Sequence, residues 1–433
     1  MKYGLLFSTF LITSVFSLAA HSADGIIMLA GGGSEGDIDV KTDWSYPLYK
    51  KLVENGDTNG DHKVKVVVIS LEKPDTNFMV DYFKSMGADV SENLVVDSRA
   101  KANNPKLVKT LKDADVIFFR GGNQGHAYQY WKDTLLHKEI LDLEKRGGAI
   151  GGTSSGTMGL AQYSITGGKD FSSKEVMSNS HSDLLNDEIH KKTSGIHNDF
   201  LNVADNMIVD THCGERGRLG RLLSAMAKAT EDFNNDKMIG LCLEERTGII
   251  ISKGKATVYG TGLAHFATED EETQKDRRPN HNLSYTGVHL DALTEGWTYD
   301  LNKRSADVES APANAKKLNF SFGCGQVKKD FKSDGHKSSD LSFEKPEGAD
   351  FIAITSDANA EEKLPSGDKK KGAIQTRAFL EMAIDPRESV MLVDESSSVR
   401  AIDDNVIKTF RKSPKGDYVP TLVLDCSECT YTS

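Results

Sequence analysis

Residues 147–159 read Gly-Gly-Ala-Ile-Gly-Gly-Thr-Ser-Ser-Gly-Thr-Met-Gly and contain a Gly-x-Ser-x-Gly core formed by Gly152, Ser154 and Gly156. The apolar residues before this core predict a short strand, and the run after it predicts a helix. In a strand–turn–helix the serine hydroxyl is exposed, and backbone N–H groups at the helix start face an oxyanion formed beside it. A glycine-rich loop with a chance serine is the alternative, because the motif is common. The catalytic interpretation requires partner residues for the serine elsewhere in the chain.

The sequence before and around this turn alternates between apolar runs and helical patterns. The predicted strands are residues 25–30, 64–69, 93–96, 115–119 and 149–154. Glycine-rich loops follow three of them, at residues 31–37, 121–124 and 151–156. This pattern predicts an α/β fold with a mostly parallel sheet and helices on both faces. Such sheets bind ligands at the carboxyl ends of their strands, where the three loops would converge.

No cofactor is predicted. Residues 31–36, Gly-Gly-Gly-Ser-Glu-Gly, formally match the dinucleotide pattern G-x-G-x-x-G. The next strand ends more than about thirty residues further on, and the acidic residue expected to bind a ribose is missing. Neither an organic cofactor nor a metal ion is implied by any other pattern in the chain.

The second half of the chain supplies candidate partners for the serine. His212 follows an apolar run, stands two residues after Asp210 and precedes three arginines. A buried structural imidazole and a solvated helix face are the alternatives for these residues. Glu244 and Glu245 lie in a predicted turn between two apolar runs, where one of them could stabilise an imidazolium.

Taken together, these motifs resemble the serine peptidase family that contains cyanophycinase and the aspartyl dipeptidase called peptidase E. The resemblance covers about residues 25–305 and is carried by the serine turn, Gly-Gly-Asn-Gln at 121–124, Asp-Thr-His at 210–212, Arg-Gly-Arg-Leu-Gly-Arg-Leu at 216–222 and Leu-Glu-Glu-Arg-Thr at 243–247. It implies a fold like that of class I glutamine amidotransferases, with serine replacing cysteine.

The resemblance also implies a role for each residue of the site. Ser154 is the expected nucleophile, His212 the base and Glu245 the acid. The backbones of Gly122 and Ser155 are expected near the oxyanion. The substrate-binding positions are Gln124, Asp210, Thr211, Arg216, Arg218 and Arg221. Ser155 and Cys213 depart from the family pattern, which often has alanine and an aromatic residue at these positions.

Three segments are predicted in the chain of 433 residues. Residues 1–23 have the positive start, apolar stretch and small residues of a signal peptide, residues 24–305 form the catalytic domain, and residues 306–433 form a β-rich C-terminal appendage of unassigned role. The expected location is therefore secreted or periplasmic, with no membrane segment after the signal is removed. The net charge of −11 is unsuited to phosphate neutralisation and excludes nucleic acid as a partner.

The five cysteines are Cys213, Cys242, Cys324, Cys426 and Cys429. Export predicts an oxidising compartment, and the odd number leaves at least one cysteine free or paired between chains. A zinc ribbon is disfavoured because Cys426 and Cys429 have no second pair, so a local or terminal disulfide is expected there. The sequence leaves the remaining pairing open.

The predicted function is that of a secreted serine-type exopeptidase that releases β-aspartyl-arginine dipeptides from cyanophycin, a poly-aspartate carrying arginine on each side chain. Asp210 or Glu35 would bind the guanidinium, and the arginines would bind the free carboxylate. An exported dipeptidase for Asp-X or isoaspartyl peptides and a non-catalytic peptide-binding protein are the alternatives. The family resemblance also suggests a homodimer.

Overall fold

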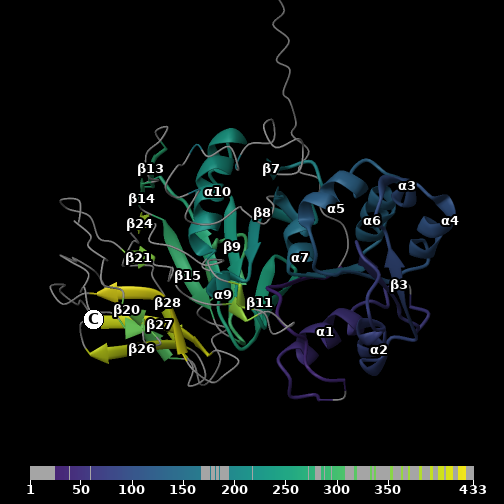
Figure 1. Cartoon of the computed structure of the whole chain (residues 1–433), viewed down its shortest axis with the longest axis horizontal. Helices are drawn as coiled ribbons and strands as arrows, with labels where there is room; N and C mark the ends of the chain where they lie inside the picture. The colour runs from purple at the N-terminus through teal and green to yellow at the C-terminus, as the bar shows by residue number, and fades with distance from the viewer. Residues whose placement is uncertain are drawn as a thin grey trace, which may run out of the picture.

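The computed structural model describes residues 25–307 except positions 39, 59, 167–175, 177–180, 182–184, 186–194, 217, 272, 278–283, 287 and 294, and beyond Asp307 it describes only strand segments. The predicted signal peptide lies outside the described residues. Figure 1 shows the helices α1–α6 at one end of the molecule and the strands near the C-terminus at the other.

One half of the fold is a nine-stranded sheet with the order β17-β16-β11-β10-β1-β5-β4-β2-β3. Strands β1, β5, β4, β2 and β3 are parallel, whereas β10, β11, β16 and β17 are each antiparallel to their neighbours. The bounds are β1 (Ile27–Ala30), β2 (Lys65–Ser70), β3 (Val90–Val95), β4 (Val116–Phe119), β5 (Ala149–Thr153), β10 (Thr247–Ser252), β11 (Lys255–Gly260), β16 (Thr298–Asp300) and β17 (Ser305–Ala306).

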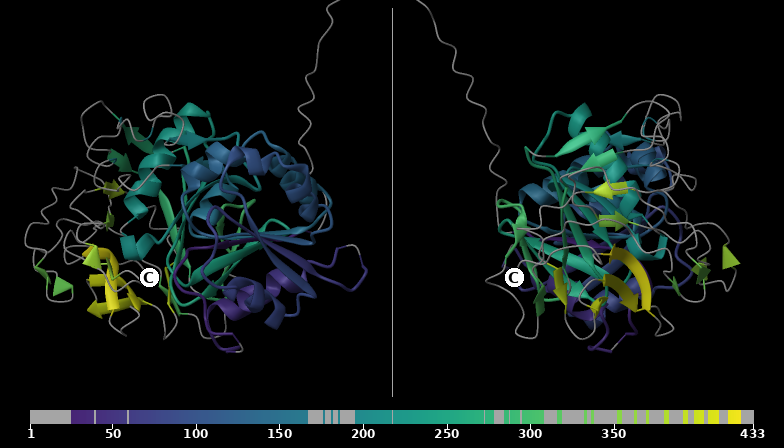
Figure 2. Two further views of the ribbon diagram at one scale, coloured as in Figure 1. Left: turned by 45° about the vertical axis from the view of Figure 1, so that its right-hand side comes forward. Right: turned by 90° about the vertical axis from the view of Figure 1, so that its left-hand side faces the viewer.

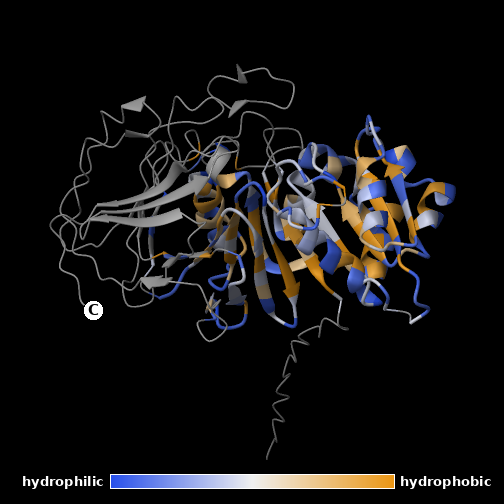
Figure 3. Cartoon of the chain, turned by 90° about the horizontal axis from the view of Figure 1, so that it is seen from below, coloured by the Kyte–Doolittle hydropathy of each residue, from blue (hydrophilic) through white to orange (hydrophobic). Residues whose placement is uncertain are grey.

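Both faces of this sheet are buried, which explains why its central strands are continuously apolar. Along β2, Val66 and Val68 belong to a core under α1 (Ser45–Glu54) and α2 (Phe78–Ser85). Val67 and Ile69 belong to a second core on the opposite face. That face is covered by α3 (Arg99–Ala102), α4 (Pro105–Val108), η1 (Lys109–Leu111), α5 (Gln124–Trp131) and α6 (Leu135–Lys145). Figure 2 shows the strands between these two groups of helices, and the colours of Figure 3 show that the strands are largely hydrophobic.

A second, eight-stranded sheet forms the other half, in the order β18-β25-β15-β12-β9-β8-β6-β7. Strands β6, β8 and β9 are parallel, and α10 (Leu219–Asp232) packs on β8 and β9. The bounds are α7 (Ser155–Leu160), β6 (Ala161–Ile165), β7 (Ile196–His197), β8 (Ala204–Thr211), α9 (Cys213–Arg216), β9 (Ile239–Leu243), β12 (Ala264–Thr268) and β15 (His289–Leu293). The predicted fold class is confirmed, with one refinement: the strands divide between two mixed sheets instead of forming one mostly parallel sheet.

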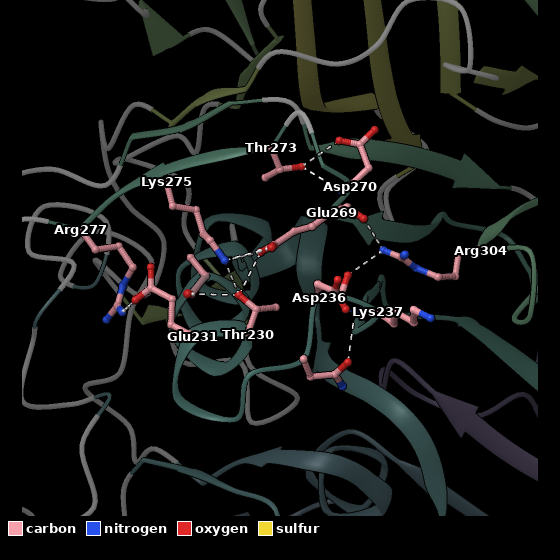
Figure 4. A network of polar contacts seen from close by, with 12 residues as sticks. Thr230, Glu231, Asp236, Lys237, Glu269, Asp270, Thr273, Lys275, Arg277 and Arg304 are labelled. Atoms are coloured by element: carbon pink, nitrogen blue, oxygen red, sulfur yellow. Dashed lines mark hydrogen bonds and ion pairs between the residues drawn. The ribbon is translucent and has the colours of Figure 1, made fainter. Parts of the chain in front are cut away.

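One end of the second sheet is held by a buried ionic network (Figure 4). The carboxylate of Glu269, just after β12, accepts hydrogen bonds from Lys275 at 2.9 and 3.0 Å and from Thr230 on α10 at 3.0 Å. The guanidinium of Arg304 donates to the backbone carbonyls of Asp236, at 3.2 Å, and of Glu269. The network joins α10, β12 and the turn after β16.

The other described strands lie late in the chain. Strands β18 (Lys316–Leu318) and β25 (Met391–Val393) extend the second sheet, and a five-stranded antiparallel sheet has the order β24-β21-β28-β27-β26. Its bounds are β21 (Ile352–Ile354), β24 (Leu380–Met382), β26 (Ser398–Asp403), β27 (Val406–Lys412) and β28 (Tyr418–Asp425). Two-stranded sheets are formed by β13 (Gln274–Asp276) with β14 (Ser284–Thr286), β19 (Lys332–Ser333) with β20 (His336–Lys337), and β22 (Glu362–Lys363) with β23 (Lys369–Lys370). Within the residues described, no helix is both long and apolar enough to cross a bilayer.

Candidate active site

Ser154 lies in the turn between β5 and α7, as the sequence predicts. Its backbone has φ 55° and ψ −125°, a conformation that non-glycine residues rarely adopt. The two glycines of the motif permit close packing around it. A Cβ on Gly152 would lie 2.7 Å from the carbonyl carbon of Gly156, and a Cβ on Gly156 would lie 2.4 Å from the carbonyl oxygen of Phe119. The glycines therefore act through their missing side chains, while the serine itself adopts the strained conformation.

Thr157 fixes this turn to the first strand, a role that sequence reasoning missed. Its hydroxyl accepts a hydrogen bond from the N–H of Ala30 at 3.0 Å and lies 2.8 Å from the carbonyl of Ala30 and 2.7 Å from that of Gly152. The N–H of Ser154 also donates to the Ala30 carbonyl, at 3.0 Å. Since Thr157 is completely buried, these bonds are shielded from water.

His212 brings its imidazole against the serine from the end of β8. Its Nε2 lies 2.6 Å from the Ser154 hydroxyl, and its Nδ1 lies 2.7 Å from Oε1 of Glu245. With Nδ1 protonated, the ring donates to the carboxylate and accepts from the serine. This is the arrangement expected of the nucleophile, base and acid of a serine hydrolase. Ser154, His212 and Glu245 are called the candidate triad below.

Glu245 lies where the chain passes from one sheet to the other. Leu243 ends β9 in the second sheet, and Thr247 begins β10 in the first. The turn between them contains Arg246 with φ 57°, and its N–H donates to the carbonyl of Gly32 at 2.8 Å. Glu245 is thus positioned by the junction of the two sheets.

The glycine loop after β1 contacts both His212 and Glu245. The carbonyl of Gly31 accepts a hydrogen bond from the N–H of His212 at 3.0 Å. A Cβ on Gly32 would lie 2.3 Å from Cε1 of His212, and one on Gly33 would lie 3.1 Å from the Cβ of Glu245. Gly32 and Gly33 have φ of 97° and 91°, which favours glycine independently of the packing. These contacts give the Gly-Gly-Gly sequence a role that does not involve a nucleotide.

The environment of His212 favours its neutral form. The pKa of the imidazole is lowered to about 4, first by burial and also by the positive charges of Arg216 and Arg218, while the hydrogen bond and charge of Glu245 oppose the shift. At neutral pH the ring is therefore neutral, and its Nε2 is able to accept the serine proton.

Of the residues assigned to the oxyanion and to substrate binding, Ser155 adjoins Ser154 in sequence, and Gly122 and Gln124 belong to a loop that begins beside it in space. A Cβ on Gly121 would lie 3.5 Å from the hydroxyl oxygen of Ser154, so the loop carrying Gly122 contacts the serine. Gln124 begins α5, where Asn123 caps the helix by accepting from the N–H of His126 at 3.1 Å. Ser155 begins α7, so its N–H has no acceptor within the helix.

The remaining substrate-binding candidates meet at the end of β8. Asp210 is fully buried and binds Arg221 through both carboxylate oxygens, with Nε 2.6 Å from Oδ2 and Nη2 2.5 Å from Oδ1. The carboxylate also accepts from the N–H of Thr211 at 2.8 Å. Arg218 is partly exposed and donates to the Thr211 carbonyl at 3.0 Å, and Arg216 is close enough to influence the His212 pKa. Asp210 and Arg221 are therefore engaged with each other, whereas Arg218 reaches the surface.

Glu244 is oriented differently from its neighbour Glu245. Its carboxylate is completely buried, accepts from the N–H of Leu263 at 3.1 Å and lies 3.4 Å from Nε2 of His265. Because Glu244 contacts β12 and Glu245 contacts the imidazole, the structure separates the two carboxylates that the sequence left equivalent.

Cys213 and Cys242 form a disulfide with 5.7 Å between their Cα atoms. The bridge links the residue after His212 to strand β9, and both cysteines are buried. The sequence left this pairing open. Cys324, Cys426 and Cys429 lie outside the described residues, so the expected local disulfide near the C-terminus stays a prediction.

Glu35 lies in the loop that follows β1. Its Oε1 accepts a hydrogen bond from the Tyr49 hydroxyl at 3.0 Å. Burial raises the pKa of the carboxyl, and hydrogen bonds and the nearby charge of Arg120 act in the opposite direction. Arg120 immediately precedes the Gly121-Gly122 loop, so Glu35 lies near the same end of the sheet as Ser154.

No metal site accompanies these residues in the part of the chain that the structure describes. Groups of three or more His, Cys, Asp or Glu side chains able to hold a metal ion are absent there.

Residues 76–258 match Peptidase family S51, and this range includes Ser154, His212 and Glu245. Together with the hydrogen bonds that join these three residues, the match defines the chain as a serine-type peptidase. Cyanophycinase of Nostoc sp. is 26% identical over 229 residues, which are 52% of this chain and 69% of that protein. Cyanophycinase of Geminocystis herdmanii is 26% identical over 214 residues, 47% of this chain and 71% of that protein. The chain is therefore a cyanophycinase-like protein, and the resemblance read from the motifs is confirmed.

Solved peptidase structures are similar to part of the chain. The crystal structure of a peptidase from an acI-B1 Actinobacterium matches with a TM-score of 0.43 and 20% sequence identity, covering 64% of this chain and 97% of that one. A putative peptidase E protein from Listeria monocytogenes matches with a TM-score of 0.33 and 17% identity, covering 55% of this chain and 99% of that one.

Proposed function

We propose that this serine-type peptidase is exported and hydrolyses cyanophycin to β-aspartyl-arginine dipeptides. The observation that supports peptide hydrolysis is the geometry of the candidate triad. Ser154 Oγ lies 2.6 Å from His212 Nε2, and His212 Nδ1 lies 2.7 Å from Glu245 Oε1. The similarity to cyanophycinases supports the substrate. The signal-like residues 1–23 support export to the periplasm or the medium.

In the proposed reaction the Ser154 hydroxyl attacks the scissile carbonyl while His212 Nε2 takes its proton. The imidazolium formed is stabilised by Glu245, and the same proton then passes to the leaving amine. Backbone N–H groups of Gly122 and Ser155 would stabilise the oxyanion. Water then hydrolyses the acyl-enzyme, with His212 again acting as the base.

Substrate recognition is assigned to charged residues near the candidate triad. Arg218, with its planar guanidinium, suits the free carboxylate of the substrate. Glu35 is the better of the two acidic candidates for the substrate guanidinium, because Asp210 is already engaged by Arg221. Arg221 and Asp210 would then support the site by fixing β8 against α10.

Mass spectrometry of the products from insoluble cyanophycin tests this proposal, with a panel of Asp-X and isoaspartyl peptides in parallel. Release of β-aspartyl-arginine supports it, and cleavage of the small peptides alone would instead indicate the dipeptidase. Ser154→Ala should lower turnover by about four to six orders of magnitude. The matched control is Ser155→Ala, which keeps the backbone N–H and should remain active. Tight binding of cyanophycin without release of any product would refute the hydrolase and favour a binding protein.

A further inference from the structure

The disulfide between Cys213 and Cys242 joins the two chain segments that carry the base and the acid. Cys213 directly follows His212, and Cys242 lies on β9 three residues before Glu245. The cysteines are 29 residues apart in sequence and are 3% and 0% exposed. The bridge therefore holds the His212 turn covalently against the strand that leads into Glu245.

His212 needs such support because its backbone is strained. Its φ of 56° is unfavourable for a residue with a side chain, and such conformations persist only where the surroundings enforce them. The pairing of β8 with β9 reaches Thr211 opposite Leu243, one residue short of His212. Beyond that point the backbone hydrogen bonds include the N–H of His212 to Gly31 at 3.0 Å, the N–H of Arg216 to His212 at 2.9 Å, and the N–H of Arg218 to Cys213 at 2.9 Å. The last two involve α9, which has four residues and little stability of its own.

We propose that the Cys213–Cys242 disulfide positions the candidate triad, so that Ser154 is activated efficiently only when the bridge is formed. The inference rests on the proposed roles of Ser154, His212 and Glu245. It makes the peptidase weakly active in a reducing compartment and fully active in an oxidising one, which suits the proposed export.

The size of the effect follows from the geometry of the two sulfurs. Reduction by a dithiol transfers two electrons and two protons, which converts the bridge to two thiols and the dithiol to its cyclic disulfide. The sulfurs then separate from a bond of about 2 Å to a contact of roughly 3.5–4 Å. A displacement of about 1 Å at a reacting group can lower the rate about 100-fold. Since Cys213 adjoins His212, a loss of roughly 10- to 100-fold is expected.

The experiment uses a variant in which Cys324, Cys426 and Cys429 are serine, so that only this pair can react. The protein is equilibrated across mixtures of reduced and oxidised dithiothreitol, and thiols are counted by the mass added on alkylation. A fluorophosphonate probe then measures the reactivity of Ser154 without requiring a known peptide substrate. Labelling should slow roughly 10- to 100-fold as two thiols appear, and it should recover on reoxidation. For the hydrolysed peptide, kcat should fall while KM changes little.

Two controls separate positioning from general stability. The double variant Cys213→Ala/Cys242→Ala should label slowly and should not respond to reductant. Glu269→Gln weakens the ionic network of Figure 4, at the opposite end of β12 from the turn that carries Glu245. It should lower the thermal midpoint without slowing the labelling.

Equal labelling of the reduced and oxidised forms, once alkylation shows two new thiols, would overturn the inference. So would loss of the circular dichroism spectrum in step with the labelling, because the bridge would then hold the fold as a whole. If the oxidised protein labels at Ser154 but releases no dipeptide from cyanophycin, the proposed substrate fails and the inference stands. An oxidised protein that does not label would overturn both.

Discussion

Glu245→Gln tests the role of Glu245 as the acid of the candidate triad while conserving the size of the side chain. Oε1 of Glu245 accepts a hydrogen bond from His212 Nδ1 at 2.7 Å and so keeps the proton on that nitrogen. A glutamine can turn its NH₂ group toward Nδ1, which moves the proton to Nε2. The imidazole is then unable to accept the proton of Ser154.

The loss expected is about 10³- to 10⁴-fold in kcat, equivalent to about 4–5.5 kcal/mol of transition-state stabilisation. The pH profile should change in a direction that identifies the cause. Burial lowers the pKa of His212 to about 4, and Glu245 opposes this shift through its hydrogen bond and charge. Removing that charge lowers the pKa further, so the acid limb of kcat/KM should move to lower pH.

Initial rates of dipeptide release, measured between about pH 3 and 9, would show both effects. The matched control is Glu244→Gln, one residue away, whose carboxylate contacts Leu263 and His265 instead. It should lower the thermal midpoint and leave the acid limb near pH 4. If Glu244→Gln shifts the limb and Glu245→Gln does not, the assignment of the acid is wrong.

Two further substitutions address the arginines. The charge of Arg218 lowers the His212 pKa, so Arg218→Met should move the acid limb to higher pH. Arg218→Lys should leave the limb in place, lower kcat/KM for substrates with a free carboxylate and barely change the thermal midpoint, because it keeps the charge and loses the planar fork. Unchanged kinetics in both variants would place Arg218 outside the site. Arg221→Met removes the bidentate partner of the buried Asp210 carboxylate and leaves Arg218, at 3.8 Å, as its ion-pair partner, and urea unfolding should show a loss of about 3–5 kcal/mol. A loss below about 1 kcal/mol would mean that the pair contributes no more than a surface ion pair.

The turn that carries Ser154 was predictable because the sequence pattern that indicates it is local. An apolar strand, a serine between glycines and a helical run are adjacent in sequence, and the structure places them as β5, Ser154 and α7. The division into two sheets was not predictable in the same way. The segments β9 and β10 read as strand, turn and strand, and only long-range pairing shows that they belong to different sheets.

The partners of the serine were harder to establish from residues alone. Glu244 and Glu245 are identical in type and adjacent, so assigning the acid depended on resemblance. The disulfide could not be derived, because five cysteines allow many pairings. Asp210 and Arg221 carry charges that suit a ligand, yet they bind each other in the interior. In each case the deciding information is which distant segment lies opposite the residue.

The backbone of the site illustrates why such information is absent from residue type. Ser154, His212 and Arg246 all have positive φ, with values of 55°, 56° and 57°, although none of them is glycine. Sequence rules place glycine at such positions. Here the glycines lie beside the strained residues instead: Gly152 packs under the serine turn, and Gly32 packs against the imidazole. Their missing side chains let neighbouring segments approach closely enough to enforce the strain. Larger residues at those two glycines would therefore be expected to displace the catalytic groups without altering any of them chemically.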